Sequence, residues 1–138
     1  MKNSINKVYL LIVLISTVGF MNCENTNDLL TEPTIQDKVQ MLESSEWLLK
    51  GFEDRIMHTF NGGEKFTYYG TNSVFDQPIP GTKDYEIEGD LLKIDFHFGN
   101  ISTFQVKFSC DNNIVEFYKE DELNMTLLKR GSNYQQCL

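Results

Sequence analysis

Apolar and polar residues alternate with a period of two along most of the chain from Trp47 onward. This alternation is typical of antiparallel strands that bury one face. The expected strands are 47–49, 56–60, 66–69, 85–87, 92–98, 104–108, 114–118 and 125–128. Turns rich in glycine, asparagine and acidic residues separate most of them. The pattern predicts an all-β domain of about seven or eight strands, which either a sandwich or a barrel would satisfy.

A helical period precedes the first strand. Ile35, Val39 and Leu42 recur at spacings of four and three, and Thr34 stands at the N-cap position. We therefore expect one short N-terminal helix that lies across one end of the domain. The strands are not separated by long helical segments, which excludes a parallel βαβ sheet.

The beginning of the chain has the layout of a secretory signal. Lys2 and Lys7 flank a short polar start, and residues 8–18 are almost wholly apolar. This run is shorter than the roughly 20 residues that a membrane-spanning helix needs. A basic start before a short apolar core predicts export.

The predicted organisation has three parts. Residues 1–22 form the signal, residues 23–33 a flexible tether, and residues 34–138 the folded domain. An alternative cleavage after Gly19 remains open, because small residues stand there at the spacing of an ordinary signal cleavage site. In that case Cys23 would be a free thiol.

The segment Phe20-Met21-Asn22-Cys23 resembles the lipobox of bacterial lipoproteins. In that family the signal is cut just before the cysteine, which carries a lipid. The resemblance implies that Cys23 is acylated. It also implies attachment to the outer membrane of a bacterial cell envelope, on its periplasmic or surface face.

The other two cysteines are Cys110 and Cys137. Disulfides persist in proteins that leave the cytoplasm, so these two residues are a natural pair. The bridge would fasten the last residues to the domain. Two unpaired, partly buried thiols are the alternative.

The formal net charge is −8, and loss of Lys2 and Lys7 with the signal would leave −10. A strongly acidic domain repels phosphate backbones, and the sequence has no stripe of Lys and Arg that would reverse this. Nucleic acid is therefore not an expected partner. Membrane attachment would have to come from the lipid.

Four segments in order resemble the lipocalin-like domains of small bacterial lipoproteins. These are Trp47-Leu48-Leu49, the hairpin 60–66, the hairpin 85–94 and the strand 126–130. The resemblance implies a small antiparallel up-and-down barrel with a central cavity. A META/HslJ-like lipoprotein domain is the competing family.

Aromatic residues and one histidine on the expected inward faces are the candidate lining of that cavity. They are His58, Phe60, Phe66, Tyr68, Phe96 and Phe98. The two histidines lie on different strands without a third ligand, so no metal site is predicted. No catalytic motif or cofactor-binding motif occurs, so we expect neither an enzyme nor a cofactor.

Two functions remain open. The first is an exported lipoprotein that binds a small apolar ligand in the barrel cavity, since a barrel of this strand count can hold one small molecule. The second is a module with a filled core that contacts another envelope protein or inhibits an enzyme. The extent to which side chains fill the interior separates the two.

Overall fold

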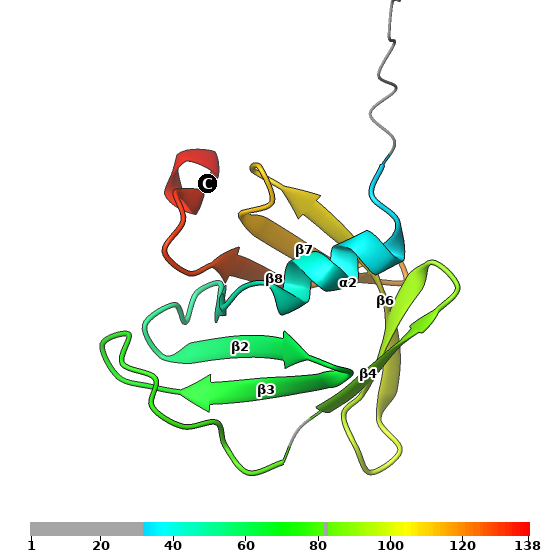
Figure 1. Ribbon diagram of the computed structural model, residues 1–138, viewed down its shortest axis with the longest axis horizontal. Coiled ribbons are helices and arrows are strands. Elements are labelled where there is room, and N and C mark those ends of the chain that lie inside the picture. The colour runs from blue at the N-terminus through cyan, green and yellow to red at the C-terminus, as the bar shows by residue number, and fades with distance from the viewer. Residues whose placement is uncertain (1–31, 82) are drawn as a thin grey trace, which may run out of the picture. The chain divides into compact units, whose positions relative to one another are not determined.

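The computed structural model describes residues 32–81 and 83–138 (Figure 1). The predicted signal 1–22, the acylated Cys23 and the tether up to residue 31 lie outside the described residues. In the described part, no helix is long and apolar enough to cross a membrane.

Eight antiparallel strands form one closed sheet, in which each strand pairs with the next in sequence and the last pairs with the first. The strands are β1 (Trp47–Leu49), β2 (Ile56–Asn61), β3 (Glu64–Tyr69), β4 (Lys83–Glu88), β5 (Leu91–Asp95), β6 (Ile101–Ser109), β7 (Ile114–Lys119) and β8 (Glu122–Lys129). The predicted up-and-down barrel with a short helix is therefore confirmed, and the sandwich is not the fold. Closure leaves no sheet edge unpaired.

The predicted helix is α2 (Ile35–Glu43), and Thr34 is its N-cap. The Thr34 hydroxyl accepts from the Asp37 backbone N–H at 3.2 Å, and the Asp37 carboxylate accepts from the Thr34 backbone N–H at 2.9 Å. This reciprocal pair is a capping box, which satisfies two N–H groups that the first turn leaves without partners. On the opposite side of the helix, Ile35 and Leu42 are buried.

The connections between strands alternate between two ends of the barrel. The chain leaves α2 and enters β1 at the end that also carries the β2–β3 turn, which we call the helix end. There the Glu43 carboxylate accepts hydrogen bonds from the Gly62 backbone N–H, at 3.1 Å, and from the Tyr85 hydroxyl. The β1–β2, β3–β4, β5–β6 and β7–β8 connections lie at the opposite end, which we call the far end.

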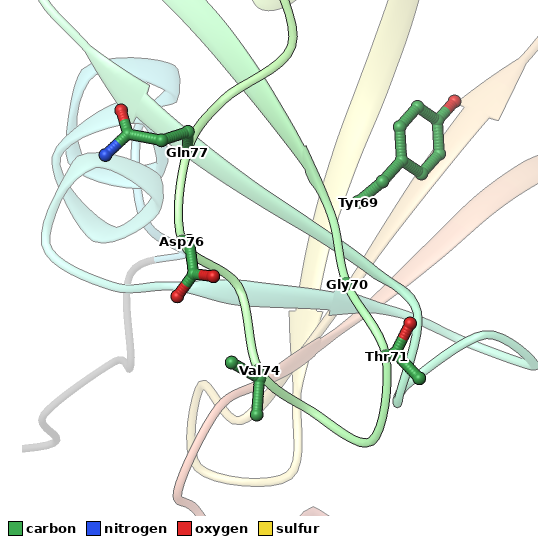
Figure 2. A pocket seen from close by; sticks show the side chains of 6 residues that line it. All are labelled: Tyr69, Gly70, Thr71, Val74, Asp76 and Gln77. Atoms are coloured by element: carbon green, nitrogen blue, oxygen red, sulfur yellow. The ribbon is translucent and has the colours of Figure 1, made fainter.

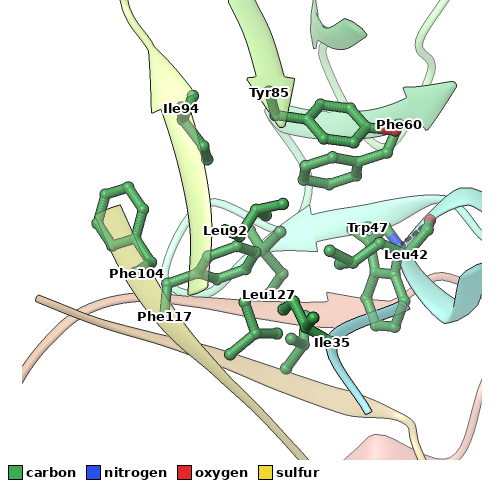
Figure 3. Close-up of a cluster of buried hydrophobic side chains, with 12 residues drawn as sticks. Ile35, Leu42, Trp47, Phe60, Tyr85, Leu92, Ile94, Phe104, Phe117 and Leu127 are labelled. Carbon is green, nitrogen blue, oxygen red and sulfur yellow. Dashed lines mark hydrogen bonds between the residues drawn. The ribbon is translucent and has the colours of Figure 1, made fainter. Parts of the chain in front are cut away.

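A packed apolar cluster occupies the barrel interior and includes the buried face of α2 (Figure 3). The rings of Phe60 and Phe117 stack with centroids 6.4 Å apart, and Phe104 meets Phe117 edge-on at 6.0 Å. The Trp47 indole N–H donates to the Leu42 carbonyl at 2.8 Å, which joins the end of α2 to β1. The buried members of the cluster are Ile35, Leu42, Trp47, Phe60, Tyr85, Leu92, Ile94, Phe104, Val106, Val115, Phe117 and Leu127.

A second cluster lies on the opposite face of the sheet and consists of Leu48, Met57, Ile114 and Leu128. We call it the outer cluster. Phe75, from the β3–β4 connection, packs against it. This explains why the strand sequences around Leu48 and Leu128 are apolar on both faces.

The end of the chain is fastened to the β6–β7 turn by a disulfide. Cys110 and Cys137 are joined, 27 positions apart in sequence. The link holds the short 3₁₀ helix η1 (Tyr134–Cys137), and Tyr134 packs against the outer cluster. The predicted pairing is therefore present in the structure.

The fifth strand is shorter than the alternation predicts. It ends at Asp95, whose carboxylate accepts from the His97 backbone N–H at 2.7 Å and turns the chain. His97 and Phe98 then adopt left-handed conformations, with φ of +68° and +56°. Phe98 is consequently fully exposed at a turn, and its predicted place in a cavity lining is wrong. An aspartate that bonds the backbone two residues ahead overrides the apolar alternation.

Candidate functional site

The β2–β3 turn decides which side chains face the interior. Asn61 pairs with Glu64, so the turn contains only Gly62 and Gly63, at φ of +58° and +90°. A turn of two residues with positive φ is the tight type that glycine favours. It places Lys65 opposite Phe60 and Thr67 opposite His58. Lys65 and Thr67 of β3 therefore face the interior, as Phe60 and His58 of β2 do. The alternate residues of β3 face outward.

The six residues predicted to line a cavity separate into three groups. His58 and Phe60 are buried on the inward face, and Phe96 packs against the interior cluster. Phe66 and Tyr68 instead lie on the outward face of β3, where Tyr68 packs against the outer cluster. Placing these two in the lining is wrong, because the two-residue turn fixes the opposite phase. Phe98 is exposed, as described above.

The interior contains a buried polar group in the place where Phe66 and Tyr68 were expected. Lys65 and His58 are 5% and 6% exposed. The Lys65 amine lies 3.0 Å from Nδ1 of His58, and Oγ1 of Thr67 lies 3.0 Å from the same atom. An ammonium group can only donate, so the bond requires His58 Nδ1 to accept and assigns the ring proton to Nε2.

Burial and charge keep the imidazole neutral. Burial, followed by the charge of Lys65, lowers the pKa of His58 from 6.5 to about 3. Burial, followed by the charge of Lys83, lowers the pKa of Lys65 from 10.5 to about 8. At neutral pH the group therefore consists of a neutral histidine and a buried lysine that is mostly protonated.

A second lysine faces the interior beside Lys65, and a third lies at the end of β7. Lys83 is paired with Lys65 across β3 and β4, and its amine donates to the Phe96 carbonyl at 3.0 Å. Lys119, at the end of β7, is exposed and pairs with Glu122 of β8, and its amine donates to the buried Ser102 hydroxyl at 3.2 Å. We call Lys65 and Lys83 the lysine pair.

Neither Lys65 nor Lys83 forms an ion pair with a described residue. Within residues 32–81 and 83–138, no carboxylate oxygen lies within 4.0 Å of either amine. The strand register also places no Asp or Glu on the inward faces of β2 to β7. This is unusual for a chain whose net charge is −8, because its many carboxylates would be available as partners. Lys65 and Lys83 therefore form a positive region in an acidic protein, while the Glu43 carboxylate bonds to Tyr85 at the helix end.

A series of cross-strand pairs leads from the far end of the barrel to Lys65. Ile56 pairs with Tyr69 at the rim, His58 pairs with Thr67 one step inward, and Phe60 pairs with Lys65 beyond that. Ile56 and Tyr69 also line a surface recess of about 330 Å³. Phe52, Arg55 and Gly70 complete its lining, so the recess lies at the rim of the two strands that hold the polar group.

A larger recess of about 410 Å³ lies on the other side of Tyr69 (Figure 2). Its lining comes from the end of β3 and the connection that follows: Tyr69, Gly70, Thr71, Val74, Asp76 and Gln77. Gly70 allows the connection to fold back closely, because a Cβ at this position would lie 2.3 Å from the Val74 carbonyl oxygen. Two recesses thus flank Tyr69, whose side chain is largely exposed.

Sequence reasoning missed Lys65, Thr67 and Lys83. The signal was present, because counting Asn61-Gly62-Gly63-Glu64 as a two-residue turn places Lys65 and Thr67 on the face of His58. The apolar pattern favoured Phe66 and Tyr68 instead, since an outward apolar face was not expected.

The site offers hydrogen-bond donors that suit an anion. No group of three His, Cys, Asp or Glu side chains that could hold a metal ion occurs among the described residues. Lysine amines and a hydroxyl supply hydrogen-bond donors for negatively charged oxygen atoms. In comparisons with known proteins, no family model, curated protein or solved structure matched this chain.

Proposed function

We propose that this chain is an exported bacterial lipoprotein, anchored through Cys23, whose barrel binds a small, largely apolar ligand that enters at the far end. The anchor would hold the barrel at the outer membrane, on the periplasmic or surface face. Its role is binding and not catalysis.

One observation carries the binding proposal. The recess at the far end is lined by the rim pair Ile56 and Tyr69, and the same strand faces continue inward to the buried His58 and Lys65. A binding site of this kind combines apolar walls with a few polar groups that fix orientation. The packed cluster extends from α2 to Phe96, so the ligand would lie beside it along the inward faces of β2 and β3.

The proposal is tested by native mass spectrometry of the full chain, purified in neutral detergent from its own host. We expect an additional mass that is lost on denaturation and that identifies the ligand. In Tyr69→Ala the adduct should decrease at least several-fold, because Tyr69 lines the rim and is too exposed to matter for folding.

The matched control is Tyr118→Phe, an outward tyrosine on β7 whose hydroxyl bonds Glu116. This variant should retain the adduct. A clean mass for the unliganded protein, or equal adducts in Tyr69→Ala and in the control, would contradict the proposal.

A second candidate function is an envelope interaction module, and exposed aromatic residues favour it. Phe98 is fully exposed at the β5–β6 connection and Phe52 is half exposed in the β1–β2 connection, both at the far end. Exposed aromatic side chains are typical anchors of protein interfaces.

This alternative is tested by placing a photo-crosslinking benzoylphenylalanine at position 98 in cells. The control position is Asp90, in the β4–β5 turn at the helix end. A single crosslinked partner from position 98 alone would support an interaction module. No crosslink, or equal crosslinking from both positions, would count against it.

A further inference from the structure

We infer that the ligand carries an anionic oxygen group, a carboxylate or a phosphate, which the Lys65 ammonium binds inside the barrel. This inference rests on the proposed function and specifies the chemical class of its ligand. The motivating observation is a buried cation that has no counter-ion among residues 32–81 and 83–138.

Lys65 is buried with a single polar partner among the described residues. The residue is 5% exposed, and its amine bonds to His58 Nδ1. An ammonium group has three N–H donors, so two remain for another acceptor. Burial of an unpaired charge is costly, and buried charges in proteins are normally paired.

The surroundings of Lys65 increase the need for an anion. Lys83 is directly across from it, and its positive charge adds to the local field. His58 cannot supply negative charge, and the inward positions of β2 to β7 hold no carboxylate. A bound anion would neutralise the charge of Lys65 and would also accept hydrogen bonds from its remaining N–H groups.

The position of the group also fits a ligand of this kind. The rim pair Ile56 and Tyr69 would contact the apolar part, and the anionic end would reach Lys65 two cross-strand pairs further in. Thr67 lies between these pairs, and its hydroxyl donates to His58 Nδ1 at 3.0 Å. The lysine would thereby fix the orientation of the ligand.

The test uses the unmodified full chain in neutral detergent, with ¹³Cε-labelled lysine, and follows each lysine by NMR over a pH range. The probes are acetate, inorganic phosphate and the neutral acetamide, at equal concentration and ionic strength. These probes carry the oxygen group alone, without the apolar part of a natural ligand. Lys65→Met assigns the Lys65 resonance.

We expect acetate or phosphate to raise the titration midpoint of Lys65 by about one pH unit, which corresponds to a tenfold stabilisation of the ammonium form. Acetamide should leave it unchanged. The anion with the larger shift identifies the ligand as a carboxylate or a phosphate. Lys107, an exposed lysine whose amine lies over the Tyr118 ring, is the internal control and should not respond.

Identical titration of Lys65 in all three probes would overturn the inference, and so would an equal response of Lys107. The proposed function fails separately. If the host-purified chain carries a neutral ligand and neither anion shifts the titration of Lys65, the proposed ligand binding is supported and the anionic class of the ligand is refuted. If the chain carries no ligand and neither anion shifts the titration of Lys65, the proposed function and this inference are both refuted.

Discussion

Replacing Lys65 by methionine should make the unliganded protein more stable. Methionine keeps the length and apolar stem of the lysine but removes its buried charge. The pKa of Lys65 falls from 10.5 to about 8 in the folded protein, mainly because of burial. One pKa unit corresponds to about 1.4 kcal/mol, so the charged lysine destabilises the folded state by about 3 kcal/mol at neutral pH.

The expected gain in the free energy of unfolding for Lys65→Met is about 1–3 kcal/mol at pH 7, in the range found when buried charges become apolar. The lower part of this range allows for the lost hydrogen bond to His58. That loss is small, because Thr67 Oγ1 still lies 3.0 Å from the same nitrogen.

The pH dependence gives the same reasoning a second test. Between about pH 8 and 10.5 the unfolded chain holds the Lys65 proton more tightly than the folded chain. The free energy of unfolding of the wild type should therefore rise with pH through this window, relative to Lys65→Met. The stabilising effect of the substitution should be constant below about pH 8 and should shrink toward pH 10.5.

Urea denaturation of the wild type, Lys65→Met and Lys107→Met at several pH values measures both effects. The exposed Lys107 is the matched control, and its substitution should change stability by less than about 0.5 kcal/mol. If Lys65→Met is destabilising at pH 7 and its pH dependence matches the wild type, the lysine charge is compensated in the folded protein and the reasoning is refuted.

The remaining predictions concern the helix end, the disulfide and acid stability. Tyr85→Phe should cost about 1–2 kcal/mol by urea denaturation, because it removes the hydrogen bond to the α2 carboxylate, whereas Tyr118→Phe on the outer surface should cost less. Replacing Cys110 and Cys137 by serine should cost about 2–4 kcal/mol; two free thiols in denatured, unreduced wild-type protein would show that the bridge is absent. His58→Gln should reduce the loss of stability between pH 6.5 and about 3, because burial keeps the folded histidine neutral while the unfolded chain takes up a proton; an unchanged acid profile would contradict this.

Strand positions could be predicted because burial of one face leaves a direct record in the sequence. Trp47, Leu92 and Phe117 are buried where the alternation places them. The helix was equally readable, because Thr34 combines a capping side chain with a spacing of four and three. These features depend on interactions between close neighbours in the chain.

The site depended on information that alternation does not contain. When both sets of alternate residues in a strand are apolar or aromatic, either set could face the interior. In β3 the sequence favoured Phe66 and Tyr68, and this choice was wrong. Only the turn length resolves this, because a shift of one residue exchanges the two faces. The outer cluster, which makes an apolar outward face favourable, is assembled from distant segments such as Phe75.

The closing contact between β1 and β8 has a consequence for the order of folding. The other strand pairings join neighbours in sequence, whereas this seam pairs Trp47 with Lys129 and is reinforced by the Glu46–Arg130 ion pair at 2.8 Å. Hairpins can form locally, but a contact of such long sequence separation carries a larger entropic cost and forms late. Until the seam closes, water can still reach the Lys65 ammonium. The cost of removing water from that charge should therefore arise in the final closing step. An anion bound at Lys65 would then lower the free-energy barrier of the step that completes the barrel.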